Sequence, residues 1–517
     1  MNNVQYFSLP TEYDRDQLFQ DLRERFDLLV EKPSLAQWSL YDTFDWRLFH
    51  RSLKLVRVAD DFFLRDLAGS RDYAAASSSQ QFPFAWDFPN GALHEQLTPI
   101  IDMRALMALV GGETRSTCFR VLNEDEKTVV RLTICEDAVA AEEGITQADV
   151  RVMLQPVRGY DREARTVAQF LDDLGLETRQ AEESYAAILR ANNLEPGSYS
   201  ARLAVKLGPD NRSGDATRTI MRALLENLEI NLPYIAQDID TEFLHDFRVS
   251  VRRTRTALSQ IKAVFPVAET ERFKEDFRYF GDLSNLLRDL DVYLLKEDVY
   301  RAMLPSSMEN DIDPVFDFLH SRRAHVLTEV ANGLASQKSQ KILRDWDAFL
   351  NQEAMDCPDA PNAGRRVADL ARESIYRRYR RVVKEGDRIL QHENPPDEWL
   401  HALRIDCKKL RYLMEFFASL FPAKGHRKLV QQLKRLQDNL GDFNDLSVQQ
   451  DFLLWIAEEM PVSSVNSRRA VLAIGSLIAT LDQRQRKEKK NFAGTFAAFA
   501  SPPNRSRFKE LYGKGAS

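Results

Sequence analysis

The sequence of 517 residues contains only four cysteines, Cys118, Cys135, Cys357 and Cys407, and no two of them are spaced as in a CxxC motif. Scattered cysteines of this kind form neither the ligand set of a structural zinc site nor a disulfide framework. We expect them to be small, buried apolar side chains. The cysteines therefore exclude a disulfide-stapled secreted domain and a zinc-binding module.

Long apolar segments are also missing. No run approaches the roughly 18 consecutive apolar residues of a membrane-spanning helix. The first residues, MNNVQYFSLPTEYDRD, lack the basic flank and the apolar stretch of a signal peptide. We therefore expect a cytoplasmic protein with no membrane partner.

Charge is distributed unevenly along the chain. Residues 1–210 hold 23 Lys and Arg against 34 Asp and Glu, a net charge of −11, whereas residues 211–517 hold 48 against 44, a net charge of +4. The length is also too great for one ordinary core. We expect an N-terminal domain over 1–207, a polar linker over 208–215, a basic domain over 216–500 and a polar tail over 501–517.

The two halves differ in their apolar pattern. Segments rich in β-branched and aromatic residues predict strands at 47–58, 117–122, 128–135, 150–157 and 200–208. Helical patterns occupy 14–29, 161–171 and 184–191, and 72–90 resembles a surface loop. From residue 216 onward the 3.6-residue period of helices takes over. The predicted fold class is α+β, with an antiparallel sheet or barrel followed by an all-α domain.

An internal repeat is the strongest pattern in the helical half. The segment HDFRVSVRRTR at 245–255 matches HALRIDCKKLR at 401–411, an offset of 156 residues. The same offset, without a gap, pairs further residues: Pro266 with Pro422, Asp289 with Asp445, Arg222 with Arg378, Arg272 with Lys428, and Arg278 with Lys434. We infer two copies of one helical unit, about 216–345 and about 362–500.

The repeated motif predicts one basic helix face. At about 100° per residue, positions 245, 248, 252 and 255 fall within roughly 80° of arc, beside an apolar stripe that includes Phe247 and Val251. Like charges at this spacing repel each other by a few tenths of a kcal/mol per pair. A solvated charged face is the alternative, but the retention of an all-cation arc in both copies favours binding of an external polyanion.

The paired HxxRxxxRRxR-type segments, each followed by an L-x-D-L-type segment, resemble the CHAD domain over residues 216–500. This resemblance implies two pseudo-symmetric four-helix bundles, binding of inorganic polyphosphate, and association with polyphosphate granules. By motif position it implies ten ligands: His245, Arg248, Arg252, Arg253, Arg255, His401, Arg404, Lys408, Lys409 and Arg411. Further cations of the predicted bundle are added as candidates: Arg272, Arg278, Arg378, Lys428 and Lys434.

The N-terminal half is similar to the CYTH or triphosphate-tunnel domain. The segments that carry this resemblance are YDTFDWRLFHRSLKLVR at 41–57 and VRVMLQPVRGYDREA at 150–164. Active members of that family carry an ExExK strand whose acidic side chains bind a divalent metal. Residues 4–9 contain no carboxylate, and Arg151, Met153 and Gln155 supply none on the later strand. We therefore expect a degenerate domain with no catalytic residues, no metal and no cofactor.

Two alternatives to a polyphosphate-binding module stay open. One is a metal-dependent triphosphatase or polyphosphatase in the N-terminal half. The other is nucleic-acid binding by the same basic face, in which Tyr376, Tyr379 and Tyr412 could stack on bases. The sequence identifies no protein partner for the N-terminal half.

Overall fold

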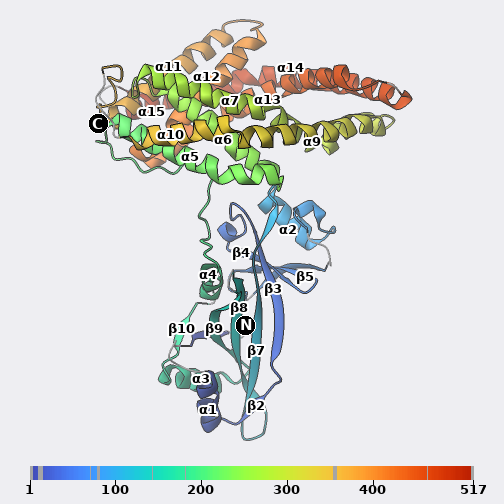
Figure 1. Cartoon of the computed structure of the whole chain (residues 1–517), viewed down its shortest axis with the longest axis vertical. Helices are drawn as coiled ribbons and strands as arrows, with labels where there is room; N and C mark the ends of the chain where they lie inside the picture. The colour runs from blue at the N-terminus through green and yellow to red at the C-terminus, as the bar shows by residue number, and fades with distance from the viewer. Residues whose placement is uncertain are drawn as a thin grey trace. The chain divides into compact units, whose positions relative to one another are not determined.

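This computed structural model describes residues 4–9, 15–69, 71–77, 82–141, 144–180, 182–352, 358–462 and 464–513. The chain divides into two compact units, Met1–Ser200 and Ala201–Ser517. The first unit is built on an antiparallel sheet and the second consists of helices, which confirms the predicted α+β class (Figure 1). Among the described residues, no helix has the length and apolar character needed to cross a membrane.

The first unit contains a ten-stranded sheet in which all neighbouring strands are antiparallel. Its strands are β1 (Gln5–Ser8), β2 (Leu28–Val30), β3 (Ser34–Thr43), β4 (Leu53–Val58), β5 (Asp61–Asp66), β6 (Asp72–Ser77), β7 (Leu106–Leu122), β8 (Thr128–Ala141), β9 (Gly144–Pro156) and β10 (Glu177–Arg179). The pairing order runs β10-β1-β9-β8-β7-β3-β4-β5-β6, and β2 also pairs with β7. Closure of this sheet into a tunnel stays a prediction.

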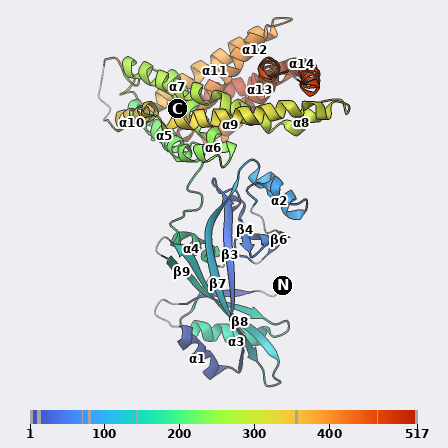
Figure 2. The same ribbon diagram turned by 45° about the vertical axis from the view of Figure 1, so that its right-hand side comes forward.

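Four helices accompany the sheet: α1 (Arg15–Arg25), α2 (Ala92–Ile101), α3 (Asp161–Asp173) and α4 (Glu182–Ala191). The helices α1 and α3 lie side by side and share one apolar core with β7, β8 and β9 (Figure 2). Leu22 of α1 and Leu171 of α3 are both fully buried in that core. A second core forms where α2 covers β4, β5 and β6.

Two predictions for this part of the chain are wrong. Residues 200–208 form no strand; instead Leu207 N–H donates to Ser419 Oγ at 3.1 Å in the helical unit. The alternating pattern is not sufficient for a strand because a side chain, not a partner strand, accepts this hydrogen bond. The expected surface loop at 72–90 contains strand β6 and the buried Phe82 and Phe88, although residues 78–81 lie outside the described part.

The second unit contains two sets of four long helices (Figure 1). The first set is α5 (Ser213–Gln237), α6 (Thr241–Gln260), α7 (Val267–Leu294) and α9 (Asp313–Ala335), with the shorter α8 (Glu297–Arg301) and α10 (Gln337–Asn351). The second set is α11 (Val367–Leu390), α12 (Asp397–Phe416), α13 (Ala423–Glu459) and α14 (Val465–Phe499), followed by α15 (Pro502–Tyr512). The helical bounds of α6 and α12 differ by 156 residues at both ends, as the repeated motif predicts.

The first helices of the two sets, α5 and α11, are not related by the 156-residue offset of α6 and α12. The starts of α5 and α11 differ by 154 residues, and their buried faces coincide only at this offset, which places Leu228 over Val382. Arg212 and Arg366, which precede the two helices at the same offset, pair with each other in an isolated β-bridge. The predicted equivalence of Arg222 and Arg378 is therefore wrong. The gap-free alignment fails here because the connection before α12 is longer than the connection before α6.

The C-terminal segment is helical up to Tyr512. In α15, Phe508 and Tyr512 are buried, and the Phe508 ring stacks on Tyr379 with centroids 3.8 Å apart. The predicted polar tail over 501–517 is wrong for this helix, because the i,i+4 spacing of its two aromatic residues creates an apolar stripe that packs on the bundle. Residues 514–517 lie outside the described part.

Gly386 provides a test of the packing between α11 and α14, because a Cβ at this position would overlap the buried ring of Phe496. We expect Gly386→Ala to lower the free energy of unfolding by about 2 kcal/mol. Gly441→Ala in α13 is the matched control, because a Cβ there meets no atom within 4 Å; it should be neutral or stabilise by up to about 1 kcal/mol. Urea unfolding followed by circular dichroism at the helix band measures both, and equal effects would contradict the packing.

Candidate functional site

The two repeated motifs lie on α6 and α12, which pack against each other where the two repeats meet. Asp240 caps α6 by accepting the backbone N–H groups of Glu242 and Phe243 at 2.9 and 3.3 Å. Each helix buries its apolar stripe, represented by Phe247 on α6 and Cys407 on α12. The cationic stripes are thereby left on the adjoining, more accessible faces.

Direct contacts join the two motif helices. Arg252 Nε donates to the Tyr412 hydroxyl at 2.7 Å, and Arg253 Nη2 lies 3.1 Å from Glu415 Oε2. Tyr412 is buried, with 8% of its surface exposed. It therefore serves as an orienting partner for Arg252 across the junction between the repeats.

Arg248 is held by neutral acceptors of α7. Its guanidinium donates to the carbonyl oxygen of Gly281 at 3.1 Å and to Ser284 Oγ and Asn285 Oδ1, both at 2.8 Å. Burial lowers the pKa of Arg248 to about 10, and Asp289 opposes this shift. Arg248 is therefore still charged at neutral pH, and its hydrogen-bonding acceptors carry no charge that would neutralise it.

Lys408 lies near Arg252 and Arg404, so cations of both repeats form one group. No hydrogen bond or ion pair involves the Lys408 ammonium within the described residues. Burial, followed by the charges of Arg404 and Arg252, lowers the pKa of Lys408 to about 8. Arg404 pairs with Asp445 at 3.0 Å, but its buried Nε has no hydrogen-bond partner among the described residues. We call Arg248, Arg252, Arg404 and Lys408 the central cluster.

Four other predicted ligands lie on the same two helices around this cluster. Arg255 is exposed and its Nη1 lies beside Gly281, whereas Arg411 pairs with Glu415 at 2.7 Å. His245 is half-buried on α6, and His401 lies 2.5 Å from Asn444 Oδ1 through its Nδ1. The structure thus places both histidines on the motif helices with the arginines, as the sequence predicts.

Arg378 and Lys409 belong to a neighbouring group. Arg378 donates to Asp406 Oδ1 at 2.6 Å and to Gln260, and Arg381 pairs with the other oxygen of Asp406 at 2.8 Å. Burial lowers the pKa of Lys409, and the charge of Arg378 lowers it further. Arg378 and Arg381 extend from α11, and Lys409 of α12 lies near them, although it follows Lys408 of the central cluster in the chain.

The remaining predicted ligands lie on α7 and α13. Arg272 forms ion pairs with Glu269 at 3.6 Å, with Asp276 at 3.8 Å and with Asp345, and Arg278 pairs with Glu275 and Asp282 at 3.6 and 3.4 Å. Lys428 and Lys434 are exposed on α13 and form no ion pair within the described residues. The residues of the first repeat are therefore ion-paired, whereas their equivalents in the second repeat, Lys428 and Lys434, are not within the described part of the chain.

Two carboxylates of the sheet unit, Asp137 and Asp149, lie in ion pairs. Strand β1 places Tyr6 opposite Met153 and Arg179. Asp137 pairs with Arg151, and Asp149 pairs with both Arg151 and Arg179, the latter at 2.8 Å. A metal ion that bound these carboxylates would have to compete with the two arginines. The described residues contain no group of three His, Cys, Asp or Glu that could hold a metal ion.

Sequence reasoning missed several residues that position these cations. Tyr412 was considered only for base stacking, whereas its hydroxyl binds Arg252. Asp406 lies within the second motif and was not recognised, although a carboxylate amid basic positions is a signal for an ion pair. Ser284 and Asn285 could not be found, because their link to Arg248 requires knowledge of how α6 packs on α7.

A comparison with protein-family models finds a match within the helical unit. Residues 219–454 match the family model of the CHAD domain. The chain is similar to two proteins of Mycobacterium tuberculosis, the uncharacterized protein Rv2226 of strain H37Rv and the uncharacterized protein MT2285 of strain CDC 1551. Each is 26% identical over 220 residues, which are 41% of this chain and 40% of the relative. The match thus spans about two fifths of the length of these curated relatives.

Two solved structures are also similar. The crystal structure of the CHAD domain from the plant Ricinus communis has 23% sequence identity and a TM-score of 0.49, and it covers 58% of this chain and 96% of that one. PptA from Streptomyces chartreusis has 15% identity and a TM-score of 0.44, with coverages of 55% and 99%. The family match, together with the duplicated motif on α6 and α12, identifies this chain as one that contains a CHAD domain.

Proposed function

We propose that the central cluster binds inorganic polyphosphate. The observation that carries this proposal is the meeting of Arg252 and Lys408, one from each repeat, with no carboxylate paired to either side chain among the described residues. Such an arrangement concentrates positive charge that the protein neutralises only in part, through Asp445 beside Arg404 and Lys408. An anionic chain that spans the junction between the repeats would supply the missing charge.

Binding would be driven by charge neutralisation and counterion release. Polyphosphate carries about one negative charge per phosphate, and a protein that neutralises such a chain releases its condensed counterions, as nucleic-acid binding proteins do. Each charge-assisted hydrogen bond contributes on the order of 1.5 kcal/mol net, so about half a dozen suffice for micromolar affinity. Arg248 and Arg252 are already oriented by α7 and Tyr412, which reduces the entropy lost on binding.

The geometry favours polyphosphate over nucleic acid at this cluster. Single-stranded nucleic acids gain affinity by stacking bases on accessible aromatic rings. Tyr412 is the aromatic side chain that contacts Arg252, and it is buried with its hydroxyl engaged. A ligand made only of phosphate groups needs no such platform. The sheet unit would then act as a companion domain rather than as a metal-dependent phosphatase, because its acidic residues near Arg151 are already ion-paired.

Charge reversal at the junction tests the proposal in the full-length chain. Arg252→Glu/Lys408→Glu should weaken binding of polyphosphate about 100-fold or more, because two charge-assisted contacts are lost. Lys32→Glu/Arg158→Glu in the sheet unit is the matched control: both residues are exposed, have no ion pair within the described residues, and give the same change in net charge. Isothermal titration calorimetry measures the affinities, and an equal loss in both variants would reduce the site to nonspecific attraction.

Salt dependence provides a second test of the same site. If each of the four cations of the central cluster neutralises one phosphate charge, log Kd should rise against log salt with a slope of about 3, at roughly 0.7 per contact. Binding measured at several salt concentrations gives this slope. A slope near zero, or affinity for double-stranded DNA equal to that for polyphosphate, would contradict the proposal.

Lys408 makes binding sensitive to alkaline pH. In the protein without ligand, the pKa of Lys408 is lowered to about 8, and a bound anion would raise it. Affinity is therefore full below pH 8 and falls as the ammonium of the unliganded protein loses its proton above pH 8. We expect a loss of up to about tenfold between pH 7 and pH 9. Lys408→Arg should remove most of this loss because guanidinium stays charged. The same pH profile in both proteins would exclude Lys408 as the titrating ligand.

A further inference from the structure

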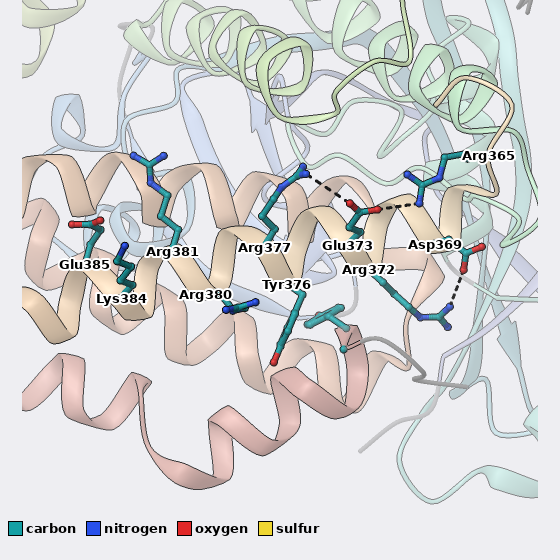
Figure 3. A pocket seen from close by; sticks show the side chains of 12 residues that line it. Arg365, Asp369, Arg372, Glu373, Tyr376, Arg377, Arg380, Arg381, Lys384 and Glu385 are labelled. Carbon is teal, nitrogen blue, oxygen red and sulfur yellow. Dashed lines mark hydrogen bonds and ion pairs between the residues drawn. The ribbon is translucent and has the colours of Figure 1, made fainter. Parts of the chain in front are cut away.

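A basic groove runs along α11, outside the central cluster. Its cavity has a volume of about 1020 Å³ and lies between α11 and the end of α15, where Tyr512 and Gly513 line it (Figure 3). A second hollow of about 730 Å³ continues along the same two helices. Tyr376, Arg380 and Lys384 line both, so the two hollows are contiguous at these residues.

Positive charge in the groove is concentrated where the hollows meet. Near the start of α11, Arg365 and Arg377 both pair with Glu373, at 3.0 and 3.8 Å, and these pairs are drawn in Figure 3. By contrast, the exposed Arg380 and Lys384 have no ion pair or hydrogen bond within the described residues. The positive charge near the start of α11 is therefore partly neutralised by Glu373. The charges of Arg380 and Lys384, where the two hollows meet, have no such ion pair within the described residues.

The fold does not require these cations. At the 154-residue offset that superposes the buried faces of α5 and α11, Arg380 corresponds to Glu226 and Lys384 to Ile230. The first repeat thus builds the same helix without basic residues at these positions. Cations confined to one of two duplicated helices indicate a property added to the second repeat rather than a packing requirement.

A buried tyrosine lines the second hollow. Tyr379 lines this hollow with only 4% of its surface exposed, and its hydroxyl has no hydrogen-bond partner within the described residues. Unsatisfied buried hydroxyl groups are costly unless a ligand or water supplies the missing bond. Burial raises the pKa of Tyr379 to about 12, so at neutral pH the hydroxyl keeps its proton and remains a donor. Lys509 of α15 lines the same hollow and is exposed.

Basic side chains connect the groove to the central cluster. Lys408 and Lys409 are adjacent on α12 and therefore point about 100° apart. Lys408 faces Arg252 and Arg404, whereas Lys409 is close enough to Arg378 and Arg381 for their charges to lower its pKa. Arg381 lines the groove, and 63% of its side chain is exposed although it pairs with Asp406. The cations thus continue from the junction of the repeats, around α12, to α11.

We propose that the α11 groove is a second segment of the anion site, which holds the part of a long polyphosphate chain that extends beyond the central cluster. The chain would pass Lys409 and Arg381 and then bind at Arg380 and Lys384. This inference rests on the proposed function of the central cluster. It assigns the groove to chain-length preference: a short oligophosphate fills the central cluster alone, and a long chain gains affinity from the groove.

The test compares two ligands, tripolyphosphate and long-chain polyphosphate, on the full-length chain. Arg380→Glu/Lys384→Glu should weaken binding of the long chain at least about tenfold and reduce its salt slope by about 1.4, the contribution of two contacts. Binding of tripolyphosphate should stay within twofold of the unmodified chain. Lys32→Glu/Arg158→Glu is again the control for net charge, and unchanged circular dichroism verifies that each variant is folded.

The outcomes separate this inference from the proposed function. Unchanged long-chain affinity in Arg380→Glu/Lys384→Glu would overturn the proposal that the groove binds the chain. Loss of both ligands in Arg252→Glu/Lys408→Glu would still support the central cluster as a binding site. Equal loss of both ligands in Arg380→Glu/Lys384→Glu would make the groove the primary site and would overturn its role as an extension. Retention of both ligands in Arg252→Glu/Lys408→Glu would contradict the proposed function itself.

Discussion

The packing of α6 on α12 forces like charges together, and the rest of the helical unit is arranged around this constraint. Both helices bury their apolar stripes, and this burial offsets the repulsion between Arg252, Arg404 and Lys408. Neutral groups then orient the cations without cancelling them: the Tyr412 hydroxyl for Arg252 and the acceptors of α7 for Arg248. Within the described part of the chain, Arg404 alone among the four has a carboxylate ion pair, with Asp445. The cluster is thus structurally supported but electrostatically incomplete.

The duplication produced two similar helices at the junction but two different surroundings. Tyr412, which binds Arg252, corresponds to Thr256 at the 156-residue offset, so Lys408 has no equivalent phenol to receive its ammonium. Lys408 also carries a smaller cation than Arg252, one that loses its proton more readily when buried. Together with the basic face of α11, these differences make the second repeat the more specialised half of the site.

Sequence patterns were sufficient for features that depend on local spacing. The period of the motif predicts α6 and α12 as helices, which the structure confirms, and it predicts one shared face for positions 245, 248, 252 and 255. The register of α5 and α11 could not be found in this way, because two arginines coincided at the wrong offset and only the buried faces reveal the right one. Similarly, 200–208 alternates as a strand does, but it has no partner strand.

Contacts between distant segments lay beyond the sequence. Neither the bond from Arg252 to Tyr412 nor the groove between α11 and α15 follows from spacing, since both depend on how helices pack. The central claim is that both repeats contribute to one anion site. The most direct measurement is the calorimetric stoichiometry of tripolyphosphate binding to the full-length chain. One tight site per chain is the result predicted here, whereas two equivalent sites, one for each repeat, would contradict it.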